Sequence, residues 1–198
     1  MKYEDVAHKM KPGDVIAFSS YGGFSDVIRD VTQANVTHVG VMLENAVDFN
    51  TVIESATIKD FCGVSVNLMR ERIEEYHGEI WWLPLDRDVR KNFKFEPFWE
   101  FLISQKGKHY DIEQALLAGL KYWLGIGDNE EDFSNFYCSE IVVAGLKKGE
   151  VIPQSINASE TTPIDVCNFG IYDGVHQLKG KPKGLLYNGH TDMFEQDY

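Results

Sequence analysis

The stretch THVGVMLENAVDFNTVIESA, residues 37–56, decides the fold predicted for this chain. It consists of two apolar segments, residues 37–43 and 51–56, joined by a polar connection of hairpin length. Successive side chains of a strand point to opposite faces, so His38 and Gly40 share one face and the valines that follow them share the other. We therefore expect an antiparallel hairpin that carries a histidine on one of its faces.

Glu54 lies among apolar neighbours in the second segment of this hairpin. If the strands pair about a centre near residue 46, His38 and Glu54 are direct cross-strand partners, with Cβ atoms about 4.5–5.5 Å apart. A carboxylate there holds the imidazole in one tautomer and stabilises its charged form. The alternative is a solvated glutamate on an exposed sheet face. A one-residue slip of the register would separate the pair.

The segments that flank the hairpin indicate more strands first and helices later. Their order favours an α+β fold built on an antiparallel sheet. The strands are expected in residues 11–20, 63–73, 78–86 and after 169, and the helices in residues 22–33, 94–107, 111–125, 138–149 and just after Pro163. An acidic loop is expected between the helices, in residues 126–135.

Composition limits the class of protein. With 198 residues and 43% hydrophobic content, the chain suits one globular domain that folds without disulfides or metals as staples. A net charge of -12 repels nucleic acid, which we do not expect as a partner. The N-terminus lacks the apolar core of a signal peptide, and no apolar run approaches the ~18 residues needed to cross a membrane. These features favour a cytoplasmic protein without an integral membrane segment.

Cys138 is the cysteine whose position suggests chemistry. It lies at the start of the helix expected over residues 138–149, where unpaired N–H groups and the helix dipole stabilise a thiolate and a developing oxyanion. Cys62 and Cys167 are distant in sequence, and no CxxC pattern indicates a zinc or dithiol site. Taken alone, this segment favours a packing cysteine, because free cysteines are commonly buried.

A nucleophilic cysteine also needs a base and a group that orients the base. Of the six histidines, His38 is the one that lies inside a strong strand pattern, and Glu54 is the acid in the next strand. The other five are most simply surface residues: His8, His77, His109, His176 and His190.

This order of a strand histidine, a glutamate on the next strand and a distant cysteine at a helix start resembles a known family. It is similar to the circularly permuted NlpC/P60-like cysteine hydrolases, which are papain-like, of the YiiX/YebB type. Six local patterns occur in the family's order, and together they favour a nucleophilic Cys138. The patterns are KPGDVIAF (11–18), GGFSDVIRDVTQANVTHVGVML (22–43), VIESA (52–56), GKHYD (107–111), FYCSEIVVAGL (136–146) and TTPIDV (161–166).

The resemblance implies a permuted papain-like α+β fold, in which a small barrel-like antiparallel sheet packs against a few helices. It implies a single hydrolase domain over residues 1–198. Residues 168–198 have no clear counterpart in the family, so we expect them to form a C-terminal extension.

The resemblance also implies the roles of the site residues. Cys138 would be the nucleophile, His38 the general base and Glu54 the group that orients the base. Tyr137 would contact the substrate or the oxyanion. The reaction implied needs no cofactor and no metal.

The expected function is therefore that of a thiol hydrolase that cleaves an amide bond in a cell-wall peptide, an isopeptide or a similar small substrate. Action on an extracellular wall would need phage delivery or lysis. One alternative is a lipid-directed thiol acyltransferase or phospholipase, although the usual Asn-Cys-Glu start of those enzymes is Tyr-Cys-Ser here. Another alternative is a non-catalytic binding module on the same scaffold. The sequence leaves the exact substrate and the oligomeric state open.

Overall fold

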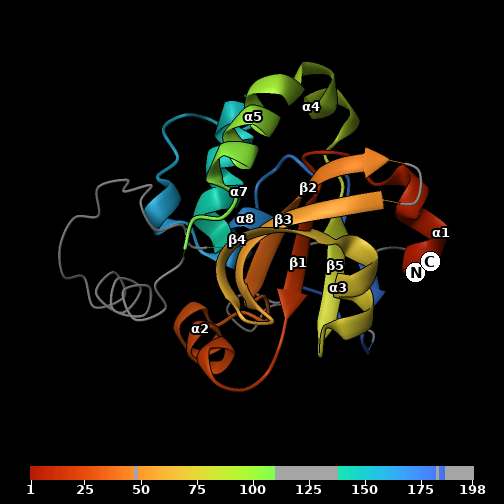
Figure 1. Ribbon diagram of the computed structural model, residues 1–198, viewed down its shortest axis with the longest axis vertical. Coiled ribbons are helices and arrows are strands. Elements are labelled where there is room, and N and C mark those ends of the chain that lie inside the picture. The colour runs from red at the N-terminus through yellow and green to blue at the C-terminus, as the bar shows by residue number, and fades with distance from the viewer. Residues whose placement is uncertain (47–48, 110–137, 182, 186–198) are drawn as a thin grey trace.

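The protein is built on one six-stranded antiparallel sheet with the strand order β4-β3-β2-β1-β5-β6 (Figure 1). The strands are β1 (Val15–Ser19), β2 (His38–Ala46), β3 (Phe49–Ile58), β4 (Phe61–Leu68), β5 (Glu79–Leu83) and β6 (His176–Lys179). The computed structural model describes residues 1–46, 49–109, 138–181 and 183–185.

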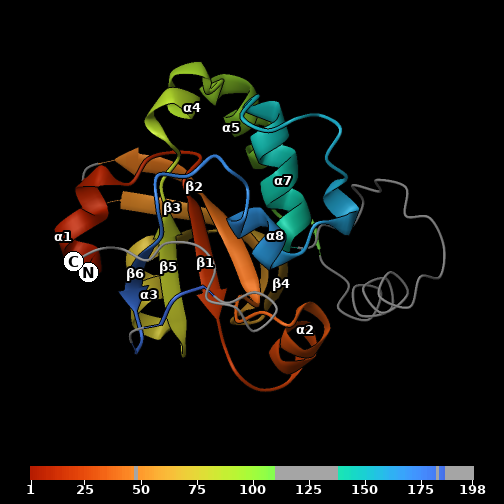
Figure 2. The same ribbon diagram turned by 180° about the vertical axis from the view of Figure 1, so that it is seen from behind.

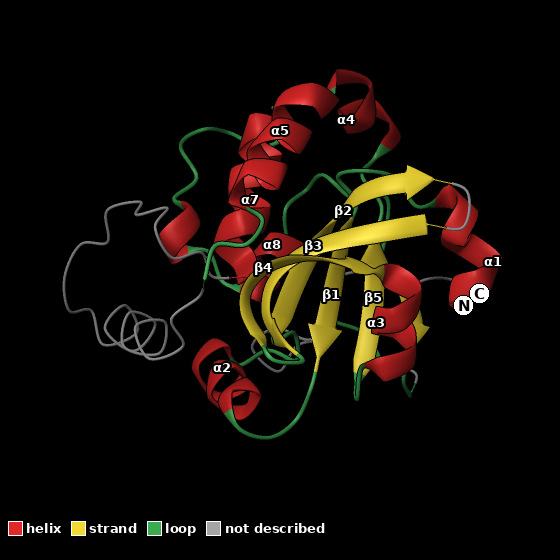
Figure 3. Ribbon diagram, in the orientation of Figure 1, coloured by secondary structure: helices red, strands yellow, loops and turns green. Residues whose placement is uncertain are grey.

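Helices pack on both faces of the sheet (Figures 1, 2 and 3). The helices are α1 (Tyr3–Val6), α2 (Phe24–Thr32), α3 (Met69–Glu75), α4 (Arg87–Asn92), α5 (Phe95–Gln105), α7 (Cys138–Lys148) and α8 (Pro163–Cys167), with 3-10 turns η1 (Ala7–Lys9) and η2 (Ala158–Glu160). Among the described residues, no helix combines the length and the apolar character that a membrane crossing demands.

Two apolar clusters, one on each face of the sheet, make up the core. The first joins the sheet to α5, α7 and α8, and the second joins it to α1 and α3. Along β1, Val15 and Ala17 belong to the first cluster, whereas Ile16 and Phe18 belong to the second. All five residues of β1 are buried because helices cover both of its faces, which explains why this strand is a continuous apolar run in the sequence.

A β-bulge in β2 sets the register of the hairpin that carries the candidate site. Val41 pairs with Ile53 and Met42 with Val52, but the next pair is Glu44 with Thr51, so Leu43 is an extra residue on β2. Without the bulge, the register near the turn would continue along the strand and put residues 38 and 54 on opposite faces. With the bulge, they share one face.

The α+β class and the antiparallel sheet predicted from the sequence are confirmed, but the expected barrel-like closure is wrong. β4 pairs with β3, and β6 pairs with β5, so the described sheet is open and has two edge strands. The C-terminal extension expected in residues 168–198 supplies β6, and its residues 186–198 lie outside the described part of the chain.

Several local predictions need correction. The polar connection expected in residues 44–50 is largely strand, because β2 extends to Ala46 and β3 starts at Phe49. The strand expected in residues 63–73 ends at Leu68, and helix α3 follows it. Neither α3 nor α4 was predicted, because they are only seven and six residues long and too short for a clear helical period. The helix expected in residues 111–125 and the acidic loop of residues 126–135 lie outside the described residues.

Asp14 ties the N-terminal turn to β5 and α4. Its buried carboxylate accepts hydrogen bonds from the backbone N–H groups of Lys11 and Leu85 and from the Trp82 indole, and it forms an ion pair with Arg90. Burial raises the pKa of this carboxyl against the opposing effect of Arg90. The aspartate of the Gly-Asp pair that precedes β1 therefore stabilises the fold.

We expect Asp14→Ala to lower the free energy of unfolding by about 3–5 kcal/mol, because it removes the carboxylate that pairs with Arg90 and leaves two buried donors, the Trp82 indole and the Leu85 N–H, without a partner. The matched control is Asp88→Ala. Asp88 pairs with Lys91 on an exposed surface, so its loss should cost about 0–1 kcal/mol. Urea denaturation of both variants measures the difference. Equal stabilities would contradict the assignment of Asp14 as a buried structural anchor.

Candidate active site

His38 is the first residue of β2 and therefore lies at the edge of the sheet where this strand begins. Its backbone pairs with Phe18 of β1, and the two rings contact each other in a tilted arrangement with centroids 5.1 Å apart. The imidazole keeps 15% of its side-chain surface exposed, so a substrate group can approach a ring that is otherwise fixed by packing.

Glu54 of β3 is fully buried and holds His38. Its Oε2 lies 2.7 Å from His38 Nε2. The expected direct cross-strand pairing is wrong in register, because the observed pairs place Glu54 opposite Gly40, two residues beyond His38. A Cβ built on Gly40 would lie only 3.2 Å from Glu54 Cβ, so the glycine leaves room for the glutamate to reach diagonally toward the imidazole.

Two further side chains complete the hydrogen bonding of the Glu54 carboxylate. Arg72 of α3 donates from Nε to Oε1 at 2.7 Å and from Nη2 to Oε2 at 3.0 Å. Asn67 of β4 donates to Oε1 at 3.0 Å. Neither residue was predicted from the sequence. The period-2 alternation of β4 places Asn67 on the Glu54 face, but Arg72 follows the strand on an unpredicted helix.

The electrostatics of the pair favour the charged forms of both groups. Burial alone would raise the pKa of Glu54, but the hydrogen bond and charge of His38, followed by those of Arg72, lower it. Burial lowers the pKa of His38, and this effect is outweighed by the charge and hydrogen bond of Cys138 and then by Glu54, so the pKa rises to about 9. The imidazole is therefore protonated at neutral pH.

Cys138 begins α7, as the sequence predicted, and its half-buried side chain contacts the first apolar cluster. The charge of Cys138 and a hydrogen bond with it raise the pKa of His38, which indicates that the thiol lies near the imidazole. Because Glu54 occupies Nε2, Nδ1 is the ring nitrogen left for the thiol. The structure thus brings Cys138, His38 and Glu54 together from α7, β2 and β3.

The other predicted site residue and the other cysteines lie elsewhere. Tyr137 is outside the described residues, so its expected contact with substrate stays a prediction. Cys62 accepts a hydrogen bond from Thr57 across the β3–β4 hairpin. Cys167 is buried in α8, and burial is the first of the effects that raise the pKa of its thiol.

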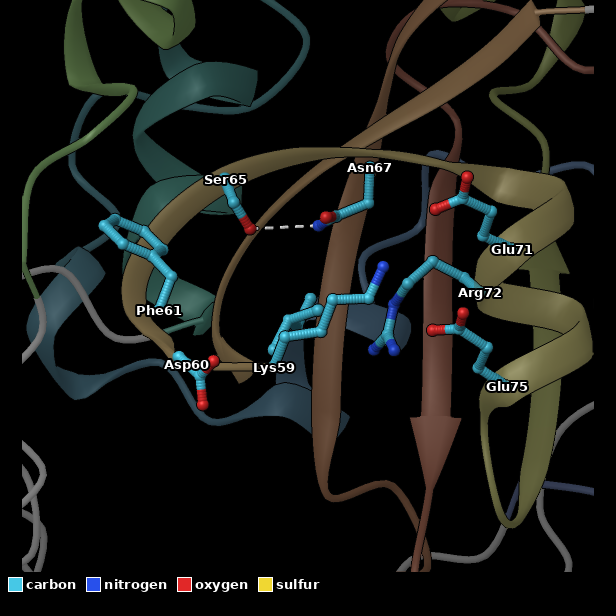
Figure 4. A pocket seen from close by; sticks show the side chains of 9 residues that line it. Lys59, Asp60, Phe61, Ser65, Asn67, Glu71, Arg72 and Glu75 are labelled. Atoms are coloured by element: carbon cyan, nitrogen blue, oxygen red, sulfur yellow. Dashed lines mark hydrogen bonds between the residues drawn. The ribbon is translucent and has the colours of Figure 1, made fainter.

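A pocket of about 480 Å³ lies between α3 and the β3–β4 hairpin, next to the two side chains that bind Glu54 (Figure 4). Arg72 and Asn67 both line it, so the two donors that hold Glu54 also form part of the pocket wall. The full lining is Ile58, Lys59, Asp60, Phe61, Ser65, Asn67, Glu71, Arg72 and Glu75. Its volume falls in the range of small-molecule sites.

Within residues 1–46, 49–109, 138–181 and 183–185, no group of three or more His, Cys, Asp or Glu side chains is arranged to hold a metal ion. The hydrogen-bonding capacity of the buried Glu54 carboxylate is used by His38, Arg72 and Asn67.

The chain was compared with known proteins. No family model matches it, and no curated protein matches it significantly. Among solved structures, it is similar to the crystal structure of metalloprotein yiiX from Escherichia coli O157:H7, with 18% identity and a TM-score of 0.44 over 87% of this chain and 98% of that chain.

We expect His38 to titrate at about 9 in the wild-type protein and at a lower pH in Cys138→Ala, because Cys138 is the strongest effect that raises its pKa. Long-range ¹H–¹⁵N correlation spectra follow the ring directly. His176 is the internal control, because burial lowers its pKa without any contribution from Cys138. A His38 pKa that is unchanged in Cys138→Ala would contradict the contact.

The raised pKa of His38 also makes the stability of the folded protein depend on pH. The folded-state pKa of about 9 exceeds the ordinary value of 6.5, so the stabilisation is fully present below pH 6.5 and is lost as the pH rises through about 9. The stability difference between the wild-type protein and His38→Ala should therefore shrink over this window. Urea denaturation at several pH values measures this difference, and a constant difference would contradict the raised pKa.

Gly40→Ala tests the space that the glutamate needs. The new methyl group would lie 2.8 Å from Val52 Cγ2 and would crowd Glu54, which we expect to cost about 1–3 kcal/mol of stability and to slow any reaction of Cys138. Gly170→Ala is the control, because no atom lies within 4 Å of a Cβ built there. Thermal denaturation compares the two variants, and a neutral Gly40→Ala would contradict the tight approach.

Proposed function

We propose that the protein is a thiol hydrolase that cleaves amide bonds through Cys138, His38 and Glu54. The observation that carries the proposal is the buried Glu54 carboxylate that lies 2.7 Å from His38 Nε2. The influence of Cys138 on the pKa of His38 supports a thiol close to the same ring. This is the arrangement of orienting group, base and nucleophile that acyl transfer to a thiol requires.

In the first half of the proposed reaction, the Cys138 proton resides on His38, and the thiolate sulfur attacks the substrate carbonyl carbon. The carbonyl π electrons move to oxygen, and the first N–H groups of α7, including that of Cys138, stabilise the oxyanion. His38 then gives its proton to the amide nitrogen. The C–N bond breaks, the amine leaves, and a thioester remains on Cys138.

In the second half, neutral His38 removes a proton from water, and the hydroxide oxygen attacks the thioester carbonyl. Collapse of this intermediate breaks the C–S bond and releases a carboxylic acid. The proton held by His38 is then shared again with the Cys138 sulfur. Glu54 stays ionised throughout and stabilises the imidazolium, in keeping with its lowered pKa.

The preference for an amide follows from the protonation state of His38. An amine is a poor leaving group unless its nitrogen is protonated, whereas an activated ester departs without that help. An imidazole whose pKa is raised to about 9 keeps the required proton at neutral pH. This supports an amide as a substrate, and because the alkoxide of a lipid ester also leaves more readily when it is protonated, a comparison of peptide amides with lipid esters decides between the two classes.

Replacing the proposed nucleophile tests the function. We expect Cys138→Ala to lose more than about 1,000-fold in the hydrolysis of fluorogenic peptide amides, because no other group of the triad can form the acyl-enzyme. Cys62→Ala is the control and should keep full activity, because Cys62 lies in the β3–β4 hairpin outside the triad. Circular dichroism checks that both variants fold.

Two outcomes would overturn the proposed function. One is hydrolysis by Cys138→Ala at the wild-type rate. The other is alkylation of Cys138 and Cys62 by iodoacetamide at equal, slow rates, which would indicate an unactivated thiol and favour a non-catalytic binding module.

A further inference from the structure

Arg72 contacts none of the atoms that would react, yet it makes more hydrogen bonds to Glu54 than any other described side chain. We propose that Arg72 is a positioning residue for the triad: it keeps Glu54 ionised and aims its Oε2 at His38. This inference rests on the proposed thiol chemistry and adds to it a residue outside the Cys–His–Glu set.

The two hydrogen bonds from Arg72 fix the rotation of the carboxylate. Arg72 Nε donates to Oε1, and Nη2 donates to Oε2. Oε2 is also the oxygen that accepts a hydrogen bond from His38 Nε2. A planar guanidinium that binds both oxygens sets the plane of the carboxylate, which a single contact cannot do. Asn67 adds a second donor to Oε1 and leaves Oε2 directed at the histidine.

Two aromatic rings, one of which also contacts His38, hold the Arg72 guanidinium in place. Its guanidinium carbon lies 5.1 Å from the centre of the Phe18 ring and 5.2 Å from that of Tyr76. The Phe18 ring also lies against the His38 ring, so one aromatic side chain contacts both the imidazole and the guanidinium. Only 11% of the Arg72 side chain is exposed, which limits its freedom to turn toward solvent.

The positive charge of Arg72 also helps to keep the buried Glu54 carboxylate ionised. Glu54 is fully buried, and a buried carboxylate tends to take up a proton unless cations surround it. Arg72 supplies a positive charge that takes no part in the proposed proton transfers, whereas His38 changes charge during the proposed reaction. The other charged groups near Arg72 line the exposed side of the pocket, where water screens them: Lys59, Asp60, Glu71 and Glu75.

The test follows the reactivity of the Cys138 thiol against pH, which requires no knowledge of the substrate. The rate of alkylation by iodoacetamide is measured by mass spectrometry of the Cys138 peptide, with the Cys62 peptide as an internal reference. In Arg72→Met, we expect the rate to fall about 10- to 100-fold, because the charged hydrogen bonds that hold Glu54 are lost. We also expect the acid limb of the pH profile to move up by about one to three units, because Glu54 protonates more readily.

Two more variants separate positioning from bulk stability. Arg72→Lys keeps the charge but loses the bidentate contact, so its rate should fall while its acid limb moves less than in Arg72→Met. Arg70→Met removes an exposed arginine from the same helix and should match the wild-type protein in both respects. Thermal denaturation shows whether each variant remains folded at the assay temperature.

A folded Arg72→Met whose pH profile superposes on that of the wild-type protein would overturn this inference and leave the proposed function intact. The inference also fails if Arg72→Met does not fold but the folded Arg72→Lys retains the wild-type rate. An unreactive Cys138 in the wild-type protein would instead overturn the proposed function, and the inference about Arg72 with it.

Discussion

A single extra residue in β2 determines whether this site can exist. Leu43 interrupts the pairing between β2 and β3, and the register on the far side of the bulge puts Glu54 on the face that carries His38. Side chains alternate with a period of two, so the same hairpin without the bulge would point the carboxylate away from the imidazole. Bulges commonly re-aim side chains next to functional sites.

Once Glu54 lies on that face, the rest of the arrangement follows from the cost of burying its charge. A carboxylate with no exposed surface must be fully hydrogen-bonded and paired. Arg72 and Asn67 meet that requirement on one side and His38 on the other. The network therefore connects β2, β3, β4 and α3, and Cys138 joins it from α7 across the end of β2.

The sequence predicted the parts of this site better than their assembly. His38 and Glu54 were singled out because each stands out from the apolar pattern of a strand, whereas Cys138 was singled out by its place at a helix start together with the resemblance to a known family. The pairing of His38 with Glu54 was predicted two residues out of register, because the strands run on to the Ala46–Phe49 pair and the hairpin is therefore centred beyond residue 46. Arg72 and Asn67 were missed because their role depends on how β4 and α3 fold back over β3. The prediction of a barrel-like closure was wrong because the alternation of polar and apolar residues does not reveal which strands lie at the edges of a sheet.

The proposed site requires that Glu54 act on the thiol only through His38, and a double-mutant cycle on the alkylation rate of Cys138 isolates this dependence. The rate is compared in the wild-type protein, His38→Ala, Glu54→Gln and the double variant. If the three groups form one chain, Glu54→Gln slows the thiol in the wild-type background and has no further effect once His38 is absent. An equal effect of Glu54→Gln in both backgrounds would show that Glu54 acts on Cys138 without His38, and the triad would not stand.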